Sequence, residues 1–492
     1  MPSSERHDRT LRVIAVAAII AAFFGFYATQ VTDVDFWWHI ASGKYIVEHR
    51  SLPDQDPFGV YDACGERCEV ILKRYPIGQV LLYLVYETGG ARGIILFKAA
   101  LLAACLLIVY RRSLALGASS PAAVLALILT GFAAVHFTGE RPQLFSVLFG
   151  AAVLSCLEGY RKTRKPWLLV CIPPIMAIWA NTHGAVLLGA ALLGLYGTGH
   201  TVETLRGRKS GLRPDMRLLV ALGIGVVCSL AGPAGIAQYV VFAREIFEGS
   251  MVIPRTSEYL SPFEVWRKLG IFMPTYWMLL VLVPVAAERL FRRGEITHAL
   301  IALFLAVITF SAFRYVLFFV FLASPFIAAG AGRFLPELQV HRRVPIALII
   351  ISMLALFYGT ATGRAFQSGI REQKFPMGAA DLAASQGLRG RAFTSLEWGG
   401  YLTWRLSPAV RVYIDGRLLD AERLVPYTNI LWATPQGLAF FRQERFDLVI
   451  VPTGNMLTGE AYPLPQYLLR DPEWRVLYRD DHSFLFQRKA GT

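Results

Sequence analysis

Charged side chains are scarce in this sequence: Asp, Glu, Lys and Arg make up 17% of its 492 residues, whereas 55% are hydrophobic. The mean hydropathy is +0.46. A soluble protein of this length carries more charge on its surface, so the composition excludes an ordinary soluble protein. It predicts a polytopic α-helical membrane protein.

Cysteine is also rare, with six residues in the chain. Two of them, Cys64 and Cys68, lie in the segment "CGERC". No second Cys or His pair has ligand spacing relative to this pair, which disfavours a metal site there. In an oxidising compartment the two could form a disulfide, and a disulfide and free thiols remain the alternatives. The others lie in apolar runs and are predicted to be inert packing residues: Cys105, Cys156, Cys171 and Cys228.

Long apolar runs dominate what the sequence does contain. The first run, 11–30, is long enough to cross a hydrocarbon core of roughly 30 Å, and no small-residue cleavage site follows it, so we expect it to be retained as a span. About eleven spans are predicted: 11–30, 92–110, 118–137, 142–159, 167–180, 184–201, 217–237, 271–288, 296–313, 314–333 and 344–362.

The basic residues predict the orientation of these spans. The net charge of +14 would indicate nucleic acid in a soluble protein, but here much of the Lys and Arg lies in short connections between apolar runs, so no nucleic-acid partner is expected. With those connections in the cytoplasm, every second connection faces outward. An odd number of spans then places the tail on the outer side with the first loop, residues 31–91.

The chain divides into a membrane part, residues 1–362, and a tail, residues 363–492. The tail is predicted to be an extracytoplasmic α/β domain with a hairpin near Asp480 and Asp481. Its β-rich runs are 391–395, 410–415, 446–452, 474–480 and 483–488, and its helix-like runs are 376–387 and 429–444.

The first loop is predicted to carry two interfacial helices, 35–49 and 75–90. Within the first helix, Trp37 and Trp38 suit the level of the lipid headgroups. Helical spacing places Asp35 near His39 and Ser42.

Polar residues near the span ends all fall on the predicted outer side: Asp33, Asp35, His39, Glu140, Arg141, Asn181, His183, Glu258 and Arg314. Ionisable groups at membrane depth are costly, so this one-sided gathering predicts a shared cavity. Taken singly, simpler roles stay open. Asp33 could cap a helix, Glu140 and Arg141 could pair locally within one turn, and Arg314 could snorkel to headgroups.

Five segments carry a resemblance to a known superfamily: "DVDFWWHIASGKYIVEHRSLPDQDPF", "RPQLFS", "WANTHGAVLLG", "EYLSPF" and "GGYLTWRLSPAVRVYIDGR". With the acidic motif directly after the first span and the outward tail, the chain resembles GT-C membrane glycosyltransferases. More closely, it resembles a bacterial group of multi-span proteins with GT-C-like architecture. The likeness covers nearly the whole chain.

The resemblance implies an inverting glycosyltransferase of the bacterial cytoplasmic membrane. Its donor would be a sugar linked to a polyprenyl phosphate, and the protein would also contact membrane lipids. Its acceptor would be a glycan, a lipid or a protein on the outer face of the membrane. No peptide-acceptor motif of the oligosaccharyltransferase kind is present, which disfavours N-glycosylation.

The motif also implies roles for individual residues. Asp35 or Asp33 would activate the acceptor hydroxyl or hold a divalent cation beside the phosphate. Of the two acids we expect Asp35 to be the base, because helical spacing places it beside His39 and Ser42, which would orient its carboxylate. The donor phosphate would be bound by Arg141, Arg314 and His183, and further cavity residues would be Glu140, Asn181 and Glu258.

Two other classes remain alternatives. A lipid or saccharide transporter or flippase also needs many spans and a polar cavity, but such proteins often have two related halves with matching broken helices. Pro173 and Pro174 interrupt one span, and no matching break appears in a second half. A non-catalytic membrane assembly protein is the third class.

Overall fold

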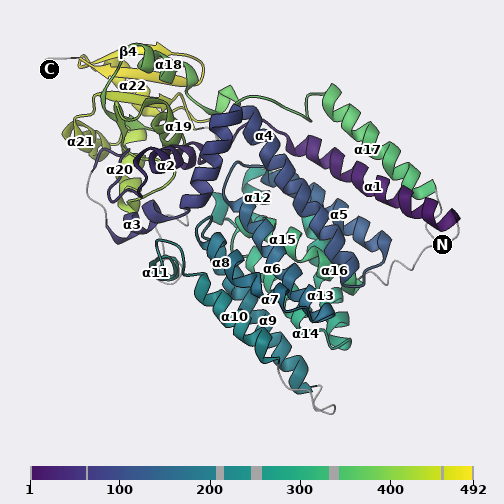
Figure 1. The fold of residues 1–492 in the computed structure, drawn as a ribbon. Helices are drawn as coiled ribbons and strands as arrows, with labels where there is room; N and C mark the ends of the chain where they lie inside the picture. The colour runs from purple at the N-terminus through teal and green to yellow at the C-terminus, as the bar shows by residue number, and fades with distance from the viewer. Residues whose placement is uncertain are drawn as a thin grey trace.

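The computed structural model describes residues 3–61, 65–206, 215–244, 257–331, 343–455 and 459–489. A bundle of helices makes up most of the molecule, and a sheet domain lies at one end of it (Figure 1). The first-loop helices α2 (Phe36–His49) and α3 (Glu66–Lys73) lie at the same end as the sheet domain. The bundle contains α1 (Ser3–Tyr27), α4 (Pro76–Ala115), α5 (Ser120–Ala134), α6 (Gln143–Thr163), α7 (Trp167–Val170), α8 (Ile172–Ala180), α9 (Val186–Arg206), α10 (Met216–Cys228), α11 (Ala237–Arg244), α12 (Pro262–Leu269), α13 (Pro274–Arg292), α14 (Ile296–Thr309), α15 (Val316–Leu322), α16 (Ser324–Ala331) and α17 (Arg343–Ala361).

Six helices of the described chain are long and apolar enough to cross a membrane, or seven if α15 and α16, bent by 52° at their junction, form one broken span. Every predicted span overlaps one of the bundle helices. Several of those helices are short, including α10 with 13 residues and α14 with 14. The chain is therefore a multi-span helical protein, and the number eleven stays a prediction.

Helix α4 joins two segments that the sequence predicts separately. Gly90, with φ 57° and ψ −153°, breaks the helix into two arms. The first arm is the predicted interfacial helix, and the second is the predicted span 92–110. Only glycine adopts this backbone conformation readily, which fixes the bend at this position.

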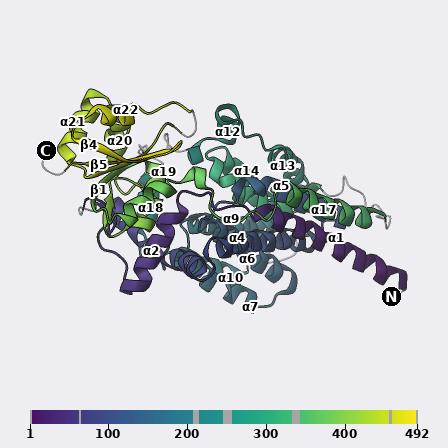
Figure 2. The ribbon, with the colours of Figure 1, turned by 90° about the horizontal axis from the view of Figure 1, so that it is seen from above.

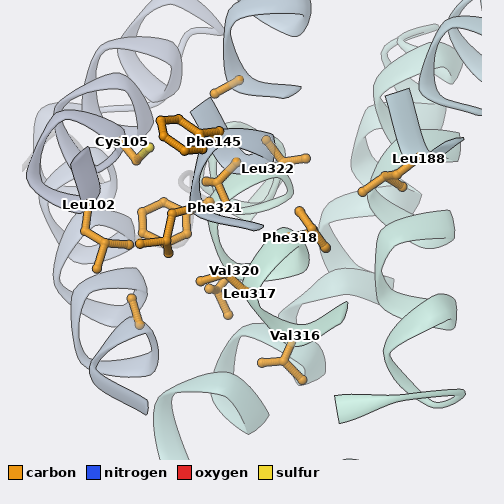
Figure 3. Packing of buried hydrophobic residues seen from close by; sticks show 14 of the residues in the cluster. Leu102, Cys105, Phe145, Leu188, Val316, Leu317, Phe318, Val320, Phe321 and Leu322 are labelled. Atoms are coloured by element: carbon orange, nitrogen blue, oxygen red, sulfur yellow. The ribbon is translucent and has the colours of Figure 1, made fainter. Parts of the chain in front are cut away.

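The core of the bundle is built around α15, whose seven residues are all buried. Figure 3 shows this helix between Leu102 and Cys105 of α4 and Leu188 of α9. At the margin, α17 packs against α1 and leaves much of its apolar surface exposed, as in Phe357 with 73% of its surface accessible (Figure 1). Such a surface suits contact with lipid.

The tail contains a mixed five-stranded sheet with strand order β2-β1-β3-β5-β4. Strand β1 pairs in parallel with β2 and β3, and β5 pairs antiparallel with β3 and β4. The strands are β1 (Gly390–Thr394), β2 (Val410–Val412), β3 (Leu448–Pro452), β4 (Trp474–Arg479) and β5 (Ser483–Arg488). The helices are α18 (Met377–Ser385), α19 (Leu396–Leu406), α20 (Leu424–Leu431), α21 (Pro435–Glu444) and α22 (Pro463–Arg470).

The predicted α/β character of the tail and its five strands are confirmed. The hairpin between β4 and β5 is also present, and the Asp480 carboxylate accepts the backbone N–H groups of His482 and Ser483 there. The helix predicted over 429–444 is wrong as one element, because Ala433 has a positive φ and separates α20 from α21. Helix α19, formed by "LEWGGYLTWRL", was not predicted.

The first loop and the tail pack against each other in both views of the molecule (Figures 1 and 2). Single β-bridges join Val31 to Ile370 and Gly59 to Val412, and α2 packs against α19. The two segments therefore share one end of the bundle, as the alternating topology requires. Which end faces the cytoplasm stays a prediction.

The headgroup position of the two tryptophans is wrong. Trp37 is fully buried, with its ring edge-on to Tyr86, Phe375 and Tyr401 at 5.8, 5.4 and 4.9 Å between centroids. Trp38 is also buried. Both residues lie where the first loop packs against the tail. Burial of these large apolar rings stabilises that packing.

Of the cysteines, Cys68 is disulfide-bonded, and Cys64 lies outside the described residues. The pairing of these two therefore stays a prediction. The four cysteines in apolar helices are free: Cys105, Cys156, Cys171 and Cys228.

Candidate functional site

One guanidinium group joins three acidic residues from separate segments. Arg141, in the turn before α6, donates from Nε to Asp33 Oδ2 at 2.5 Å, and its Nη2 lies 3.0 Å from Asp35 Oδ2. Its Nη1 pairs with Glu258, in the short helix η5 (Ser257–Tyr259). Asp33 lies between α1 and α2, and Asp35 precedes the first residue of α2.

The backbone around Asp33 is held by two neighbours. Asp33 Oδ1 accepts the N–H of Asp35 at 2.9 Å, a local turn that starts α2. Glu140 accepts the N–H groups of Thr32 and Asp33 at 3.2 and 3.0 Å. Glu140 itself is buried and pairs with Lys98 of α4. This ion pair fixes the start of the first loop against the bundle.

Asp35 has the environment of a proton acceptor. Its side chain is 20% exposed, against 9% for Asp33. Burial raises the pKa of Asp35 to about 7; Arg141 acts in the opposite direction, and the charges of Asp33 and Glu258 add to the rise. A carboxyl group with this pKa exchanges protons near neutral pH, as a general base must.

His39 and Ser42 do not orient this carboxylate as expected. In the described part of the chain, no hydrogen bond joins either side chain to the Asp35 carboxylate; Arg141 holds it instead. His39 is buried with its ring against Trp38. Burial and the charge of Arg141 lower its pKa well below the usual value, so the imidazole is neutral.

A first cavity of about 370 Å³ lies beside the acidic cluster. Asp33, Arg141, Glu258 and Arg314 line it, together with Lys374, which precedes α18 in the tail. The membrane part and the tail thus both contribute to its wall.

A second cavity of about 360 Å³ has a different character. Much of its wall is apolar, with Leu187, Leu188, Phe304, Ile308 and Phe318 among the lining side chains. Its polar residues include Arg74, Tyr75, His183, Tyr259 and Arg314.

Arg314 lines both cavities. It does not snorkel outward: its Nη1 donates to the Tyr259 hydroxyl at 3.0 Å and lies 3.8 Å from Glu258 Oε2. A cavity lined by charged side chains of both signs and a largely apolar cavity therefore adjoin at this guanidinium group.

His183 presents a neutral donor to the second cavity. Its Nδ1 accepts the backbone N–H of Ala185 at 3.3 Å, so the Ser146 hydroxyl, 2.8 Å away, donates to the same atom. The ring proton therefore sits on Nε2. Burial, reinforced by Arg314, Arg74 and Arg141, lowers the pKa of His183 to about 3. A cationic role of His183 does not fit this environment, whereas a hydrogen-bond donor role does.

Four of the residues predicted to share a cavity line neither of the two: Asp35, His39, Glu140 and Asn181. Asn181 donates to the carbonyls of Ala177 and Ala231 at 2.9 and 3.2 Å and closes the end of α8. Glu140 pairs with Lys98 and accepts the backbone N–H of Asp33, so the local ion pair between Glu140 and Arg141 is not formed.

Four residues at or behind the site were not among the predicted site residues: Tyr75, Lys98, Tyr259 and Lys374. Lys98 had a readable signal, because it is a lone charge in an apolar run, and such a charge normally has a specific partner. The other three have no distinguishing pattern in the sequence.

The acidic residues do not fit a divalent cation. Both Asp33 and Asp35 are engaged by Arg141, which occupies the space between them. In the described segments, no group of three or more His, Cys, Asp or Glu residues converges as metal ligands would.

No protein-family model matches this sequence, and no curated protein matches it either. Solved structures do match. The oligosaccharyltransferase of Archaeoglobus fulgidus, tethered to an acceptor peptide, has a TM-score of 0.62 at 11% identity over 98% of this chain and 74% of its own. The same enzyme, AglB, in complex with an inhibitory peptide and a dolichol-phosphate, has a TM-score of 0.59 at 12% identity. This match covers 92% of the chain described here and 70% of the AglB chain.

A bacterial structure matches along almost the whole of both chains. ArnT from Cupriavidus metallidurans, bound to undecaprenyl phosphate, has a TM-score of 0.51 at 15% identity over 97% of this chain and 98% of its own. AglB and ArnT are both GT-C membrane glycosyltransferases. The chain described here has the GT-C fold.

Proposed function

We propose that this protein is a glycosyltransferase that moves a sugar from a polyprenyl-phosphate donor to an acceptor on the outer face of the cytoplasmic membrane. The observation that carries the proposal is the pair of cavities that adjoin at Arg314, one largely apolar and one beside an acidic cluster. A lipid-linked sugar consists of an apolar chain, a phosphate and a polar sugar in that order. The apolar chain matches the largely apolar cavity, the phosphate matches Arg314, and the sugar matches the cavity beside the carboxylates.

The second cavity suits the lipid and its phosphate. Its apolar wall would hold the first isoprene units, and Arg314 and the Nε2–H of His183 would donate to the phosphate. Arg74, on the same wall, adds a further positive charge. The sugar would then lie toward the first cavity and the carboxylates.

Asp35 would act as the general base. As the acceptor oxygen attacks the anomeric carbon, its proton passes to the Asp35 carboxylate. The bond between the anomeric carbon and the phosphate oxygen breaks, and its electron pair leaves with the polyprenyl phosphate. Arg314 would stabilise that departing charge, so no separate acid is needed. Attack opposite the leaving group inverts the anomeric centre.

Arg141 receives a different role from the one expected from the sequence. Three of its nitrogens already face Asp33, Asp35 and Glu258. We therefore assign to Arg141 the orientation of Asp35, and we assign phosphate binding to Arg314.

Lipid binding tests the proposal without knowledge of the acceptor. Purified protein in nanodiscs would be titrated with undecaprenyl phosphate and, as a control, with undecaprenol, which lacks the phosphate. We expect the phosphate lipid to raise the unfolding temperature with saturation, and the alcohol to do so far less. Equal effects of the two lipids, or none, would contradict a phosphate site at Arg314.

A transfer assay tests the chemistry. A panel of polyprenyl-phosphate sugars would be incubated with the protein and with cell-envelope material as the source of acceptors. We expect one class of donor to be converted to polyprenyl phosphate plus a glycosylated product. A lipid that moves between leaflets but keeps its sugar would instead indicate a flippase.

A further inference from the structure

The tail segment Asp415–Arg417 lies directly against Asp35. A Cβ atom built on Gly416 would collide with Asp35 Oδ1 and would lie 3.4 Å from Trp38 Nε1. The backbone of Gly416 therefore covers one face of the carboxylate. Gly416 does not have a positive φ, so what this position requires is space and not a special backbone conformation.

A buried ion cluster holds this turn on the first loop. Arg417 donates to Asp415 from Nε at 2.9 and 3.0 Å and from Nη2 at 2.6 Å. The same group donates to Asp56 of the first loop, from Nη1 at 2.7 Å and from Nη2 at 3.1 Å. All three side chains are buried, and the guanidinium lies over the ring of Phe58. Arginine can bind two carboxylates at once in this geometry, whereas lysine cannot.

Two glycines of α19 bring the helix close to the same place. A Cβ on Gly399 would lie 2.6 Å from Asp415 Cβ, and a Cβ on Gly400 would lie 3.2 Å from the backbone nitrogen of Trp38. Small residues at these positions let the tail pack tightly against both the turn and the start of α2.

We propose that the Asp415–Arg417 turn positions Asp35: Gly416 excludes water from one side of the carboxylate, and Arg417 fixes the turn to the first loop. Arg141, Asp33 and Glu258 are the charged groups that face Asp35 from the other elements, and Gly416 of the tail adds no charge there. Transfer then requires a docked tail. Gly416 and Arg417 are positioning residues, and their effect on activity rests on the proposed role of Asp35.

The test uses two variants with matched controls. Gly416→Ala places a methyl group against the carboxylate, and its control is Gly194→Ala, at a site in α9 with open space around the added carbon. Arg417→Lys breaks the bidentate contact with Asp56, and its control is Arg405→Lys, which changes an exposed ion pair of α19. Arg417→Lys keeps the proposal testable if Gly416→Ala fails to fold.

Hydrogen exchange of peptides covering residues 33–41 gives a readout that needs no activity. We expect faster exchange in both variants and unchanged exchange in both controls. For transfer, we expect kcat to fall at least tenfold with the donor KM within twofold, because the second cavity is untouched. In Gly416→Ala, the acidic limb of the pH profile should move to lower pH, because a carboxylate displaced toward water has a lower pKa.

The outcomes separate this proposal from the proposed function. Unchanged exchange at residues 33–41 in both variants would overturn the positioning role, whatever the activity. So would faster exchange with kcat and the pH profile left as in the wild type. Faster exchange in the two variants, together with no sugar transfer by the wild type, would leave the docking of the tail supported and would refute the proposed function instead.

Discussion

At the scale of single residues, the balance of charge around Arg141 explains the behaviour of Asp35. Three carboxylates, those of Asp33, Asp35 and Glu258, face two guanidinium groups, those of Arg141 and Arg314. Within these contacts the carboxylates outnumber the guanidinium groups by one. Asp35 is the acid whose pKa is raised, so it is the group that gains and loses a proton near neutral pH.

The pH dependence of transfer follows from this assignment. The base is active only when deprotonated, and burial raises the pKa of Asp35 to about 7. We expect kcat to be constant above about pH 8 and to fall about tenfold for each pH unit below 7. Initial rates between pH 5 and 9 at saturating donor would measure this. A rate that stays constant down to pH 5 would contradict a base with a raised pKa.

Arg314→Lys should weaken donor binding although the charge is retained. A lysine loses the planar fork that can donate two hydrogen bonds to one phosphate. A charge-assisted hydrogen bond contributes about 1.5–3 kcal/mol, so we expect the donor KM to rise about ten- to a hundredfold. The matched control is Arg292→Lys, at an exposed ion pair of α13. An unchanged donor KM in Arg314→Lys would remove this residue from the phosphate site.

At the scale of elements, the sequence predicts individual helices and strands better than the bends and contacts that connect them. The strands of the tail were found because β-branched and aromatic residues cluster in short runs, and the helix 35–49 was found from its spacing. The bend at Gly90 could not be predicted, since Gly89 and Gly90 look alike in the sequence. Helix α19 was missed because its two glycines lower the local helix propensity, and packing on α2 overrides that preference.

The neighbouring glycines of α4 provide a matched test of the bend. Neither Gly89 nor Gly90 has an atom within 4 Å of an added Cβ, but only Gly90 has a positive φ. We expect Gly90→Ala to lower the free energy of unfolding by about 1–3 kcal/mol, the usual cost of such a conformation. Gly89→Ala should leave it unchanged or raise it slightly. Equal stability of the two variants in denaturant titrations would contradict a bend fixed by Gly90.

At the scale of the whole molecule, the site is assembled by parts that are far apart in the sequence. The first loop supplies Asp35, the turn before α6 supplies Arg141, and the turn before α15 supplies Arg314. The sequence could predict this convergence only through the shared side of the membrane. It could not predict which groups would pair. The acids Asp33, Asp35 and Glu140 are all expected on the same side of the membrane, so any of them could pair with a basic residue there.

The shared end of the bundle leads to a topological prediction. We expect an impermeant maleimide to label exposed cysteines at Ser51→Cys in the first loop and Ser385→Cys in the tail of intact cells. Thr163→Cys, at the end of α6 in a basic connection, should be labelled only after the membrane is permeabilised. Labelling of the tail position only after permeabilisation would contradict the outward tail.

The central claim is that Asp35 is the base of a lipid-linked sugar transfer, and Asp35→Asn tests it most directly. The amide keeps the shape of the side chain but cannot accept the proton, so the variant should fold and bind undecaprenyl phosphate as the wild type does. We predict a loss of transfer of about 10²- to 10⁴-fold, measured with the donor that the wild type uses. Full transfer by a correctly folded Asp35→Asn protein would contradict the account, and loss in Asp33→Asn alone would move the role of the base to Asp33.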